Sequence, residues 1–132
     1  MKHILKINQK PVRSGKESIP DGAICGNGDI GLILGNSDKG MRIYISKCDL
    51  WHGVESKSEG GQKPLGYIDI EIPNELYQNY YVEQDIDNGE VRCKFENKNK
   101  KIQINLRASK TENSIMLETE SEEKISPVMK VF

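Results

Sequence analysis

The stretch from Glu90 to Arg107 reads EVRCKFENKNKKIQINLR, and its pattern decides the fold class. Apolar and polar residues alternate on both sides of a polar run at 96–100, as in two half-buried strands joined by a turn. The same period of two, or a short apolar run, recurs at 30–34, 41–45, 67–72, 114–118 and 127–132. Turn signals such as Asn88-Gly89 separate these segments. Short strands at this spacing predict an all-β fold, an antiparallel β-sandwich.

The composition bounds the size of the protein and the kind of partner it can have. The chain has 132 residues and a formal net charge of −1, with 36% hydrophobic and 30% charged residues. We expect a single β-sandwich domain over residues 1–132. A nucleic-acid module would carry a basic excess, and a membrane span needs about 20 consecutive apolar residues, which the chain lacks. We therefore expect neither nucleic acid nor a membrane among its partners.

The cysteines and the N-terminus bear on the cellular setting. Cys25, Cys48 and Cys93 are an odd number at wide spacing without a CxxC motif, so we expect neither a disulfide framework nor a zinc site. Cys25 and Cys93 lie in apolar stretches, which predicts small buried side chains. The apolar stretch after Met1 is too short for a signal peptide. The chain as given is expected in the cytoplasm, and it would be exported if a longer N-terminus had been removed.

Two segments differ from the strand pattern. Residues 54–63 have no apolar periodicity and contain two adjacent glycines, so we expect a surface loop. Residues 74–81 have room for one helical turn before Tyr80-Tyr81-Val82, which favours a strand.

A cluster of glycines satisfies a nucleotide-binding pattern but lacks its context. Residues 26–31 read GNGDIG and match GxGxxG. That fingerprint requires a helix directly after it, and residues 32–36 are too short and end in Gly-Asn. The glycines instead indicate a tight turn that leads into a buried strand, because glycine permits positive φ and close backbone approach.

The only tryptophan lies in a second group of interest. Trp51 is close in sequence to Asp49 and His52, where a predicted strand meets the loop at 54–63. An indole face beside a carboxylate and an imidazole suits a sugar. In the alternative interpretation Trp51 covers the core, Asp49 bonds local backbone N–H groups and His52 is solvated. His3 and His52 lack metal-ligand spacing, and the sequence has no GxSxG motif or Ser/His/Asp order. We therefore predict no catalytic residue, no metal site and no cofactor.

Four segments in this order carry a resemblance to a known family: IPDGAICGNGDIG at 19–31, IYISKCDLWHG at 43–53, PLGYIDI at 64–70 and YYVEQDIDNGEV at 80–91. Together they resemble the N-terminal β-sandwich domain of family 95 glycoside hydrolases, the α-L-fucosidase-type enzymes, and related N-terminal domains of glycoside hydrolases. Cys25 and Cys48 depart from the residues usual at those positions.

The resemblance implies a supersandwich-like domain that is larger than this chain and is followed by a helical barrel. The family's catalytic residues lie in that barrel, and no residue here matches them. Asn27, Asp29, Asp49 and Trp51 match the N-terminal motifs, whose loops lie near the boundary between sandwich and barrel. With His52 added, these five are the expected ligand-binding residues.

Three functions follow as expectations. In the first, the chain is a non-catalytic N-terminal domain that supports a helical-barrel catalytic domain in carbohydrate degradation, and it has no activity alone. In the second, it is a free-standing carbohydrate-binding module that uses Trp51 as a platform. In the third, it is a structural domain without a ligand, which forms a homodimer through exposed strand edges.

Overall fold

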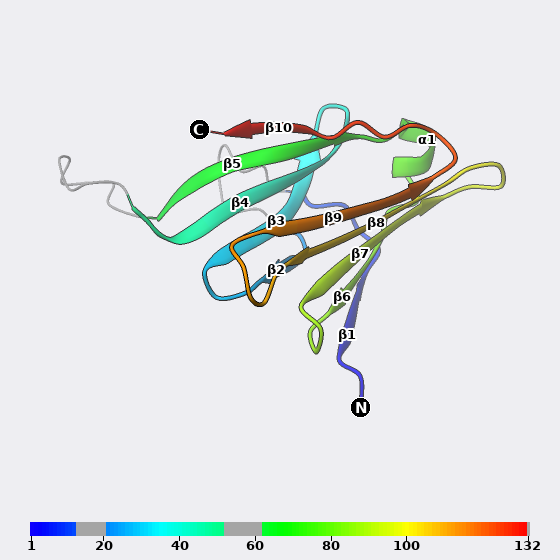
Figure 1. The fold of residues 1–132 in the computed structure, drawn as a ribbon. Helices are drawn as coiled ribbons and strands as arrows, with labels where there is room; N and C mark the ends of the chain where they lie inside the picture. The colour runs from blue at the N-terminus through cyan, green and yellow to red at the C-terminus, as the bar shows by residue number, and fades with distance from the viewer. Residues whose placement is uncertain (13–20, 52–61, 132) are drawn as a thin grey trace.

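The computed structural model describes residues 1–12, 21–51 and 62–131, and its elements are almost all strands (Figure 1). Sheet A contains β1 (Ile4–Ile7), β6 (Tyr81–Asp85), β7 (Glu90–Glu96), β8 (Lys101–Ala108) and β9 (Ile115–Ser121). Sheet B contains β2 (Ile24–Gly26), β3 (Ile30–Ser37), β4 (Gly40–Trp51), β5 (Gln62–Glu71) and β10 (Val128–Val131). A short helix, α1 (Asn74–Tyr77), lies between β5 and β6 in the chain.

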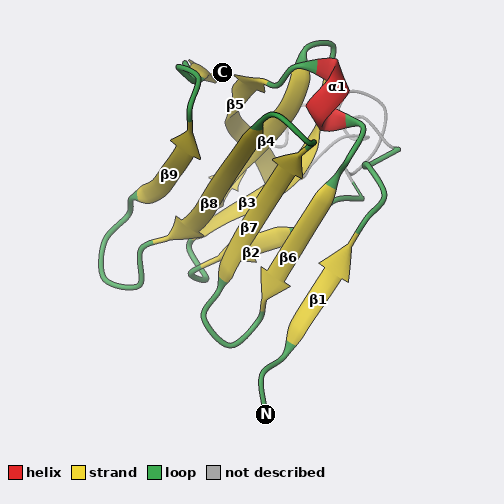
Figure 2. Cartoon of the chain, turned by 90° about the vertical axis from the view of Figure 1, so that its right-hand side faces the viewer, coloured by secondary structure: helices red, strands yellow, loops and turns green. Residues whose placement is uncertain are grey.

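Both sheets are antiparallel, and together they form a β-sandwich. Their strand orders are β1-β6-β7-β8-β9 and β10-β5-β4-β3-β2. Each sheet is therefore a simple meander with one strand from a distant part of the chain added at its edge. Figure 2 shows β1 and β9 at opposite edges of sheet A. The predicted all-β, antiparallel sandwich is confirmed. In the described residues no helix is long and apolar enough to cross a membrane.

The stretch that predicted the fold forms the β7–β8 hairpin. Phe95 pairs with Ile102, and Glu96 with Lys101 at the end of the ladder next to the turn. The turn is held by Asn97, whose side-chain oxygen accepts hydrogen bonds from the N–H groups of Asn99 and Lys100 at 2.9 and 2.8 Å. Asparagine favours such turns because its short side chain can bond the backbone two or three residues ahead.

The core lies between the inward faces of the two sheets. Alternate residues of each strand point inward, as the period of two predicts. The fully buried side chains are Leu32, Leu34, Met41, Ile43 and Ile70 from sheet B, and Val82, Val91, Cys93, Phe95, Ile104 and Leu106 from sheet A. Helix α1 adds Leu76 and Tyr77, and the Tyr77 ring contacts Phe95 with 5.5 Å between ring centroids. The helix thereby closes one end of the sandwich.

Some element boundaries differ from the sequence prediction. Strands β1 and β2 were not predicted, because their short segments do not alternate clearly between apolar and polar residues. Strand β5 begins at Gln62, within the predicted loop, because Gln62 pairs with Trp51 and extends the ladder. The rest of that loop, 54–61, lies outside the described residues. The predicted helical turn is α1, and the strand predicted after it is β6.

The three cysteines are free thiols in different surroundings. Cys93 is fully buried, as predicted, whereas Cys25 is only half-buried and Cys48 is exposed. Burial raises the pKa of Cys25 to about 11, and the nearby Glu90 carboxylate adds to this shift. These two thiols therefore act as small apolar side chains.

A buried carboxylate organises the β6–β7 hairpin. Asp85 is 4% exposed. It accepts hydrogen bonds from the side-chain amide and the backbone N–H of Asn88 at 2.9 and 3.1 Å, and from Arg92 at 3.0 Å. The Asn88 side-chain amide, the Asn88 N–H and the Arg92 guanidinium, in that order, hold the pKa of Asp85 below its ordinary value of 3.8.

Replacing Asp85 by asparagine is expected to make stability depend less on pH. A carboxylate whose pKa is lower in the folded state contributes stability above its ordinary pKa of 3.8, and this contribution is lost as the pH falls through the folded value. Asp85→Asn should therefore unfold at lower urea concentration than the wild type near neutral pH. The two midpoints should converge as the pH falls below about 4. Asp38→Asn, in the exposed β3–β4 turn, is the matched control. A midpoint difference that is constant with pH would contradict the role assigned to Asp85.

Candidate functional site

The turn between β2 and β3 is built around Asn27. Its side-chain oxygen accepts hydrogen bonds from the N–H groups of Asp29 and Ile30 at 2.9 and 2.8 Å. Its amide nitrogen donates to the carbonyl of Ser109 at 2.7 Å. Gly28 takes φ +94°, a backbone conformation that favours glycine. Because Ser109 directly follows β8, the Asn27 side chain ties the turn of sheet B to sheet A.

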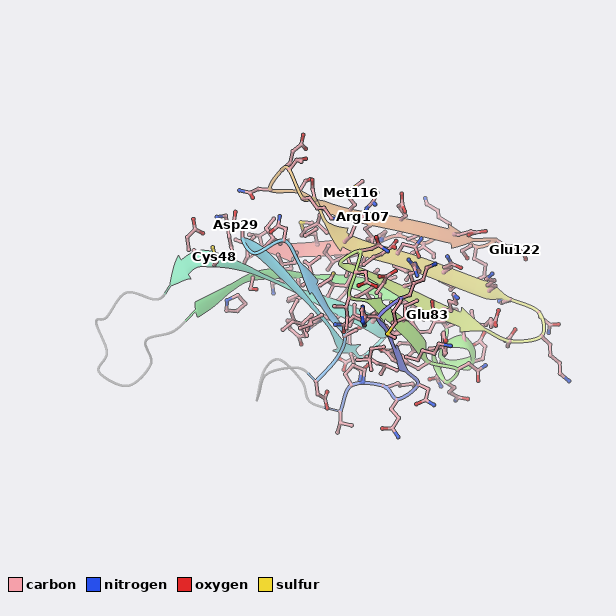
Figure 3. The ribbon with its side chains drawn as sticks, turned by 90° about the horizontal axis from the view of Figure 1, so that it is seen from below. Asp29, Cys48, Glu83, Arg107, Met116 and Glu122 are labelled. Carbon is pink, nitrogen blue, oxygen red and sulfur yellow. The ribbon has the colours of Figure 1, made fainter. Side chains whose placement is uncertain are left out.

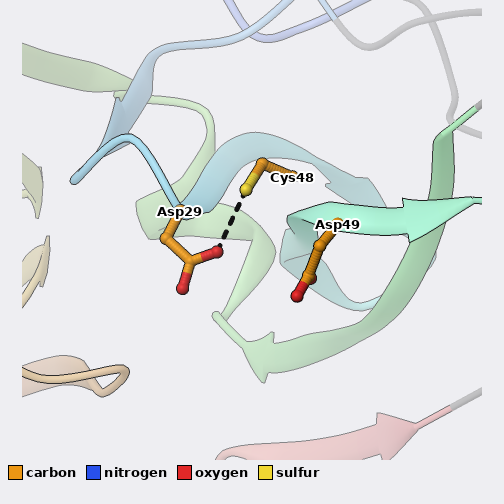
Figure 4. A group of neighbouring side chains, drawn as sticks. All are labelled: Asp29, Cys48 and Asp49. Carbon is orange, nitrogen blue, oxygen red and sulfur yellow. Dashed lines mark hydrogen bonds between the residues drawn. The ribbon is translucent and has the colours of Figure 1, made fainter.

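The end of β4 packs against this turn and carries the second motif. The backbone N–H of Cys48 donates to the carbonyl of Asp29 at 2.8 Å. The Cys48 thiol donates to the Asp29 carboxylate at 3.1 Å, as Figure 4 shows. Lys47 bridges two carboxylates, with its Nζ 3.0 Å from Asp29 and 2.7 Å from Asp49. Two segments about 20 residues apart in sequence thus form one polar cluster, composed of Asp29, Lys47, Cys48 and Asp49.

Neighbouring residues of β4 reach the same carboxylate, next to an irregularity in the pairing of β4 with β5. The register between β4 and β5 shifts between Ser46 and Trp51. In a regular strand Lys47 and Cys48 would point to opposite faces of the sheet. Here both side chains nevertheless reach the Asp29 carboxylate, which lies just before β3.

The charges in the cluster stabilise one another. The Cys48 thiol, followed by the Lys47 ammonium, holds the pKa of Asp29 below its ordinary value. The hydrogen bond to Asp29 in turn raises the pKa of Cys48. The Asp49 carboxylate, followed by that of Asp29, raises the pKa of Lys47. The Asp29 carboxylate is therefore held in its ionised form and the Cys48 thiol in its protonated form.

The same atoms have the spacing of metal ligands. The side-chain oxygens of Asp29 and Asp49 and the sulfur of Cys48 lie within 4.8 Å of one another. Lys47 already supplies a cation to both carboxylates, and a metal ion would have to displace it. We therefore assign the cluster as an ion-pair network and not as a metal centre.

A cleft of about 500 Å³ opens beside the turn. Its lining includes Gly28, Gly31 and Ser46 from sheet B and Gln84 from sheet A. Glycine at position 31 leaves room for the Ser46 side chain, because a Cβ atom there would lie 2.7 Å from the Ser46 hydroxyl oxygen. Exposed Ile24 adds an apolar surface. The cleft thus combines apolar walls with a few polar groups, which suits a small polar ligand or a side chain of a neighbouring domain.

The structure places the five predicted ligand residues in three settings. Asn27 points to Ser109 and serves the turn. Asp29 and Asp49 come together through Lys47. The backbone of Trp51 pairs with Gln62 at the end of β4, while its side chain and the whole of His52 lie outside the described residues.

Sequence reasoning missed the roles of Lys47 and Cys48. One signal was present: Lys47 and Asp49 are two residues apart in a predicted strand and therefore share a face. Nothing in the sequence indicated that the Cys48 thiol would bond Asp29.

Replacing Asp29 by asparagine is expected to make Cys48 more reactive. The carboxylate raises the thiol pKa by accepting its hydrogen bond, so removing the charge increases the thiolate fraction. Alkylation of Cys48 by iodoacetamide, followed by mass spectrometry, should be about 3-fold faster or more in Asp29→Asn. Asp49→Asn is the control and should have a smaller effect, because Asp49 acts on the thiol only through its charge. Equal rates in Asp29→Asn and wild type would contradict this account.

The sequence was compared with known proteins. The family model DUF5703_N, described as a domain of unknown function (DUF5703), matches residues 8–131. A comparison with curated proteins found no significant match. The matched range contains every element from β2 to β10, including the turn at Asn27 and the end of β4. The chain therefore belongs to the DUF5703_N family, N-terminal domains of unknown function.

Proposed function

We propose that this chain is the non-catalytic N-terminal β-sandwich domain of a glycoside hydrolase-like protein, and that it supports a helical-barrel catalytic domain in carbohydrate degradation. One observation carries the proposal. Two of the segments that resemble the N-terminal domains of family 95 glycoside hydrolases, 19–31 and 43–53, meet through Asp29, Lys47 and Cys48. The membership in a family of N-terminal domains agrees with this role.

The chemistry of the cluster supports a role without catalysis. Most glycoside hydrolases need two carboxyl groups, one of which has a raised pKa and donates a proton to the leaving group. Here the pKa of Asp29 is lowered. Asp29 and Asp49 also contact the same ammonium group, that of Lys47. This pair therefore suits the fixing of a loop or the acceptance of a sugar hydroxyl, and not proton donation.

The place of the cluster suggests how it acts. The proposed role of Asp29, Asp49, Trp51 and His52 is to form one wall of a sugar pocket where the sandwich meets the barrel. Asn27 acts behind them, since it fixes the turn to sheet A through Ser109. The ion pairs of Lys47 hold the loop in place before a ligand arrives, which reduces the entropy lost on binding.

The test compares the chain with the complete product of its reading frame. Both are assayed with aryl α-L-fucoside and a panel of other aryl glycosides. We expect the complete product to hydrolyse at least one of these substrates and the chain alone to hydrolyse none. In the complete product, Asp49→Ala should raise KM more than it lowers kcat, because Asp49 is proposed to bind and not to react. Glu71→Ala, an exposed residue at the end of β5, is the control.

Two results would contradict the proposal. The first is a complete product that is folded but hydrolyses none of the substrates. The second is an isolated chain that binds a glycan tightly while the complete product is inactive, which would make it a free-standing carbohydrate-binding module. Trp51 is the only tryptophan, so its fluorescence reports such binding in a glycan titration.

A further inference from the structure

Strand β9 is the longest edge strand of the sandwich. It has 7 residues, whereas the other edge strands, β1, β2 and β10, have 4, 3 and 4. In the described part of the chain, β9 pairs only with β8. Natural proteins usually keep free edges short or interrupt them with proline, and β9 has neither feature. A long regular edge of this kind is a template for an added strand.

The hydrogen bonds of the β8–β9 hairpin show which backbone groups of β9 face the free edge. The N–H of Ser109 donates to the carbonyl of Ser114 at 2.9 Å, directly beyond the last pair of the ladder. The backbone groups of successive strand residues point to opposite sides, so every second residue after Ser114 also faces β8. The N–H and C=O groups of Ile115, Leu117 and Thr119 therefore lie at the outer edge, where an added strand would bond them.

A second copy of β9, paired about Leu117, would complete the inward face of the strand. In this antiparallel register Leu117 lies opposite its own copy, and Ile115 lies opposite Thr119. The partners of these three residues on β8 are all buried, so the three side chains point inward. In the single chain, however, Ile115 and Leu117 are only half-buried and Thr119 is exposed. The second copy would cover them with the same three residues and extend the core.

The outward face of β9 is complementary in charge to a second copy in the same register. Glu118 then lies opposite Met116 of the second copy, so no glutamates of the two strands face each other. Beside Met116 on β8 is Arg107, and Figure 3 shows these two residues next to each other. Arg107 and Glu118 are both exposed. Among the described residues no carboxylate pairs with Arg107, because Glu90, opposite it on β7, bonds Arg92 instead at 2.8 Å.

Arg107 of each copy can reach Glu118 of the other. The two residues share a face and lie two strands apart, a separation of about 10 Å between their backbones, which their long side chains span across Met116. A twofold axis makes the contact twice. Other registers lack it. Pairing about Glu118 sets this residue opposite its own copy, pairing about Thr119 sets it opposite Glu120, and pairing about Met116 shortens the ladder.

The strand directions favour β9 of the second copy over its β1. The strands of sheet A alternate in direction, so β1 and β9 run the same way. If β1 of a second copy lay beside β9, with both cores on the same side, the pair would be parallel and the next β9 would stay free. That arrangement generates an open filament, whereas antiparallel pairing of β9 with β9 closes the assembly at two copies.

We propose that two copies of the chain associate through β9 in the antiparallel register centred on Leu117, which joins the two A sheets into one continuous sheet. The inward residues of both β9 strands extend the core, and Arg107 of each copy pairs with Glu118 of the other. The inference goes beyond the proposed function and does not depend on a glycoside hydrolase activity.

Sedimentation equilibrium of the chain tests the association. We expect a dimer whose fraction rises with concentration up to about 1 mM, because a short ladder buries less area than a standard interface. Glu118→Arg and Arg107→Glu each place like charges on both sides of Met116, and each should raise the dimer Kd about 10-fold or more. The double variant Arg107→Glu/Glu118→Arg reverses both charges and should restore the wild-type Kd. Glu71→Arg, at an exposed position at the end of β5, is the matched control and should leave the Kd unchanged.

Cross-linking through introduced cysteines tests the register. The background is Cys48→Ser, which removes the exposed native thiol. Under mild oxidation with copper phenanthroline, Leu117→Cys should give a disulfide-linked dimer, because the Cα atoms of a hydrogen-bonded strand pair are about 5.5 Å apart, within the range of a disulfide. Thr119→Cys should give none, since Thr119 lies opposite Ile115 in this register.

Three results would overturn the proposal. A chain that stays monomeric up to about 1 mM would leave the β9 edge to a partner of another kind. A dimer whose Kd does not respond to Glu118→Arg or Arg107→Glu would lie on another surface. A dimer that cross-links through Thr119→Cys and not through Leu117→Cys would use β9 in a different register.

Discussion

Replacing Phe95 by alanine is expected to lower the free energy of unfolding by about 3–5 kcal/mol, the usual cost of truncating a buried aromatic side chain. Phe95 is fully buried. Its ring packs against Tyr77 and Tyr80, with centroid distances of 5.5 and 5.8 Å. Such aromatic contacts add to the apolar area lost and to the cavity left behind. Urea denaturation followed by circular dichroism measures the change.

A matched control shows whether the destabilisation comes from the buried position of Phe95 or from the removal of a large apolar side chain as such. Met129 is a large apolar residue that is 60% exposed on β10, so Met129→Ala should change the unfolding free energy by less than about 0.5 kcal/mol. Phe95→Leu keeps most of the volume and should fall between the two. A Phe95→Ala variant that loses no more than Met129→Ala would show that Phe95 does not occupy the core as described.

Replacing Asn27 by alanine is expected to cost about 2–3 kcal/mol, since it removes three hydrogen bonds worth about 1 kcal/mol each. Two of them hold the turn, from the N–H groups of Asp29 and Ile30, and the third joins the turn to Ser109. Because the turn carries Asp29, its loss also loosens the ion pair with Lys47. Urea denaturation gives the energy, and faster alkylation of Cys48 reports the loosening.

A second variant, Asn27→Asp, separates the contribution of the hydrogen bonds within the turn from that of the hydrogen bond to Ser109. Asn27→Asp keeps an oxygen acceptor for the turn but loses the donor to the Ser109 carbonyl and places a carboxylate beside it. We expect a stability loss comparable to that of alanine, with slower Cys48 alkylation than in Asn27→Ala. If alanine is tolerated without a measurable loss, the turn is held by its backbone alone and the motif has another purpose.

Much of the fold was predictable because each of its long strands has one solvent-exposed face and one buried face. Phe95 and Ile102 belong to segments whose alternation is regular, and both lie where the pattern placed them. Strand β1 escaped prediction for the opposite reason: of its residues only Ile7 is even half-buried, so the segment has no contrast between two faces. Its position follows from pairing with β6, which is a long-range contact that local patterns do not encode.

In the candidate site, too, the local backbone turn was predictable and the long-range contacts were not. The glycines at 26–31 indicated a tight turn, and the structure contains it, with Gly28 at φ +94°. The direction of each side chain was beyond sequence reasoning, since the partner of Asn27, Ser109, lies 82 residues further along the chain. Lys47 became the shared cation because the turn between β2 and β3 brings Asp29 beside the end of β4, and a contact between two such segments is not visible in a local pattern.

The placement of β1 has a consequence for synthesis on the ribosome. Ile4 pairs with Asp85, so β1 is made first but has no partner until β6 has left the ribosome. Strands β2 to β5 pair in sequence order and can form their meander during this interval. Domains are synthesised at about 5–20 residues per second, so the delay for β1 is several seconds. During that time Ile4 and Leu5 are apolar residues on an unpaired segment, so this segment stays exposed longer than the strands that pair with their neighbours in sequence.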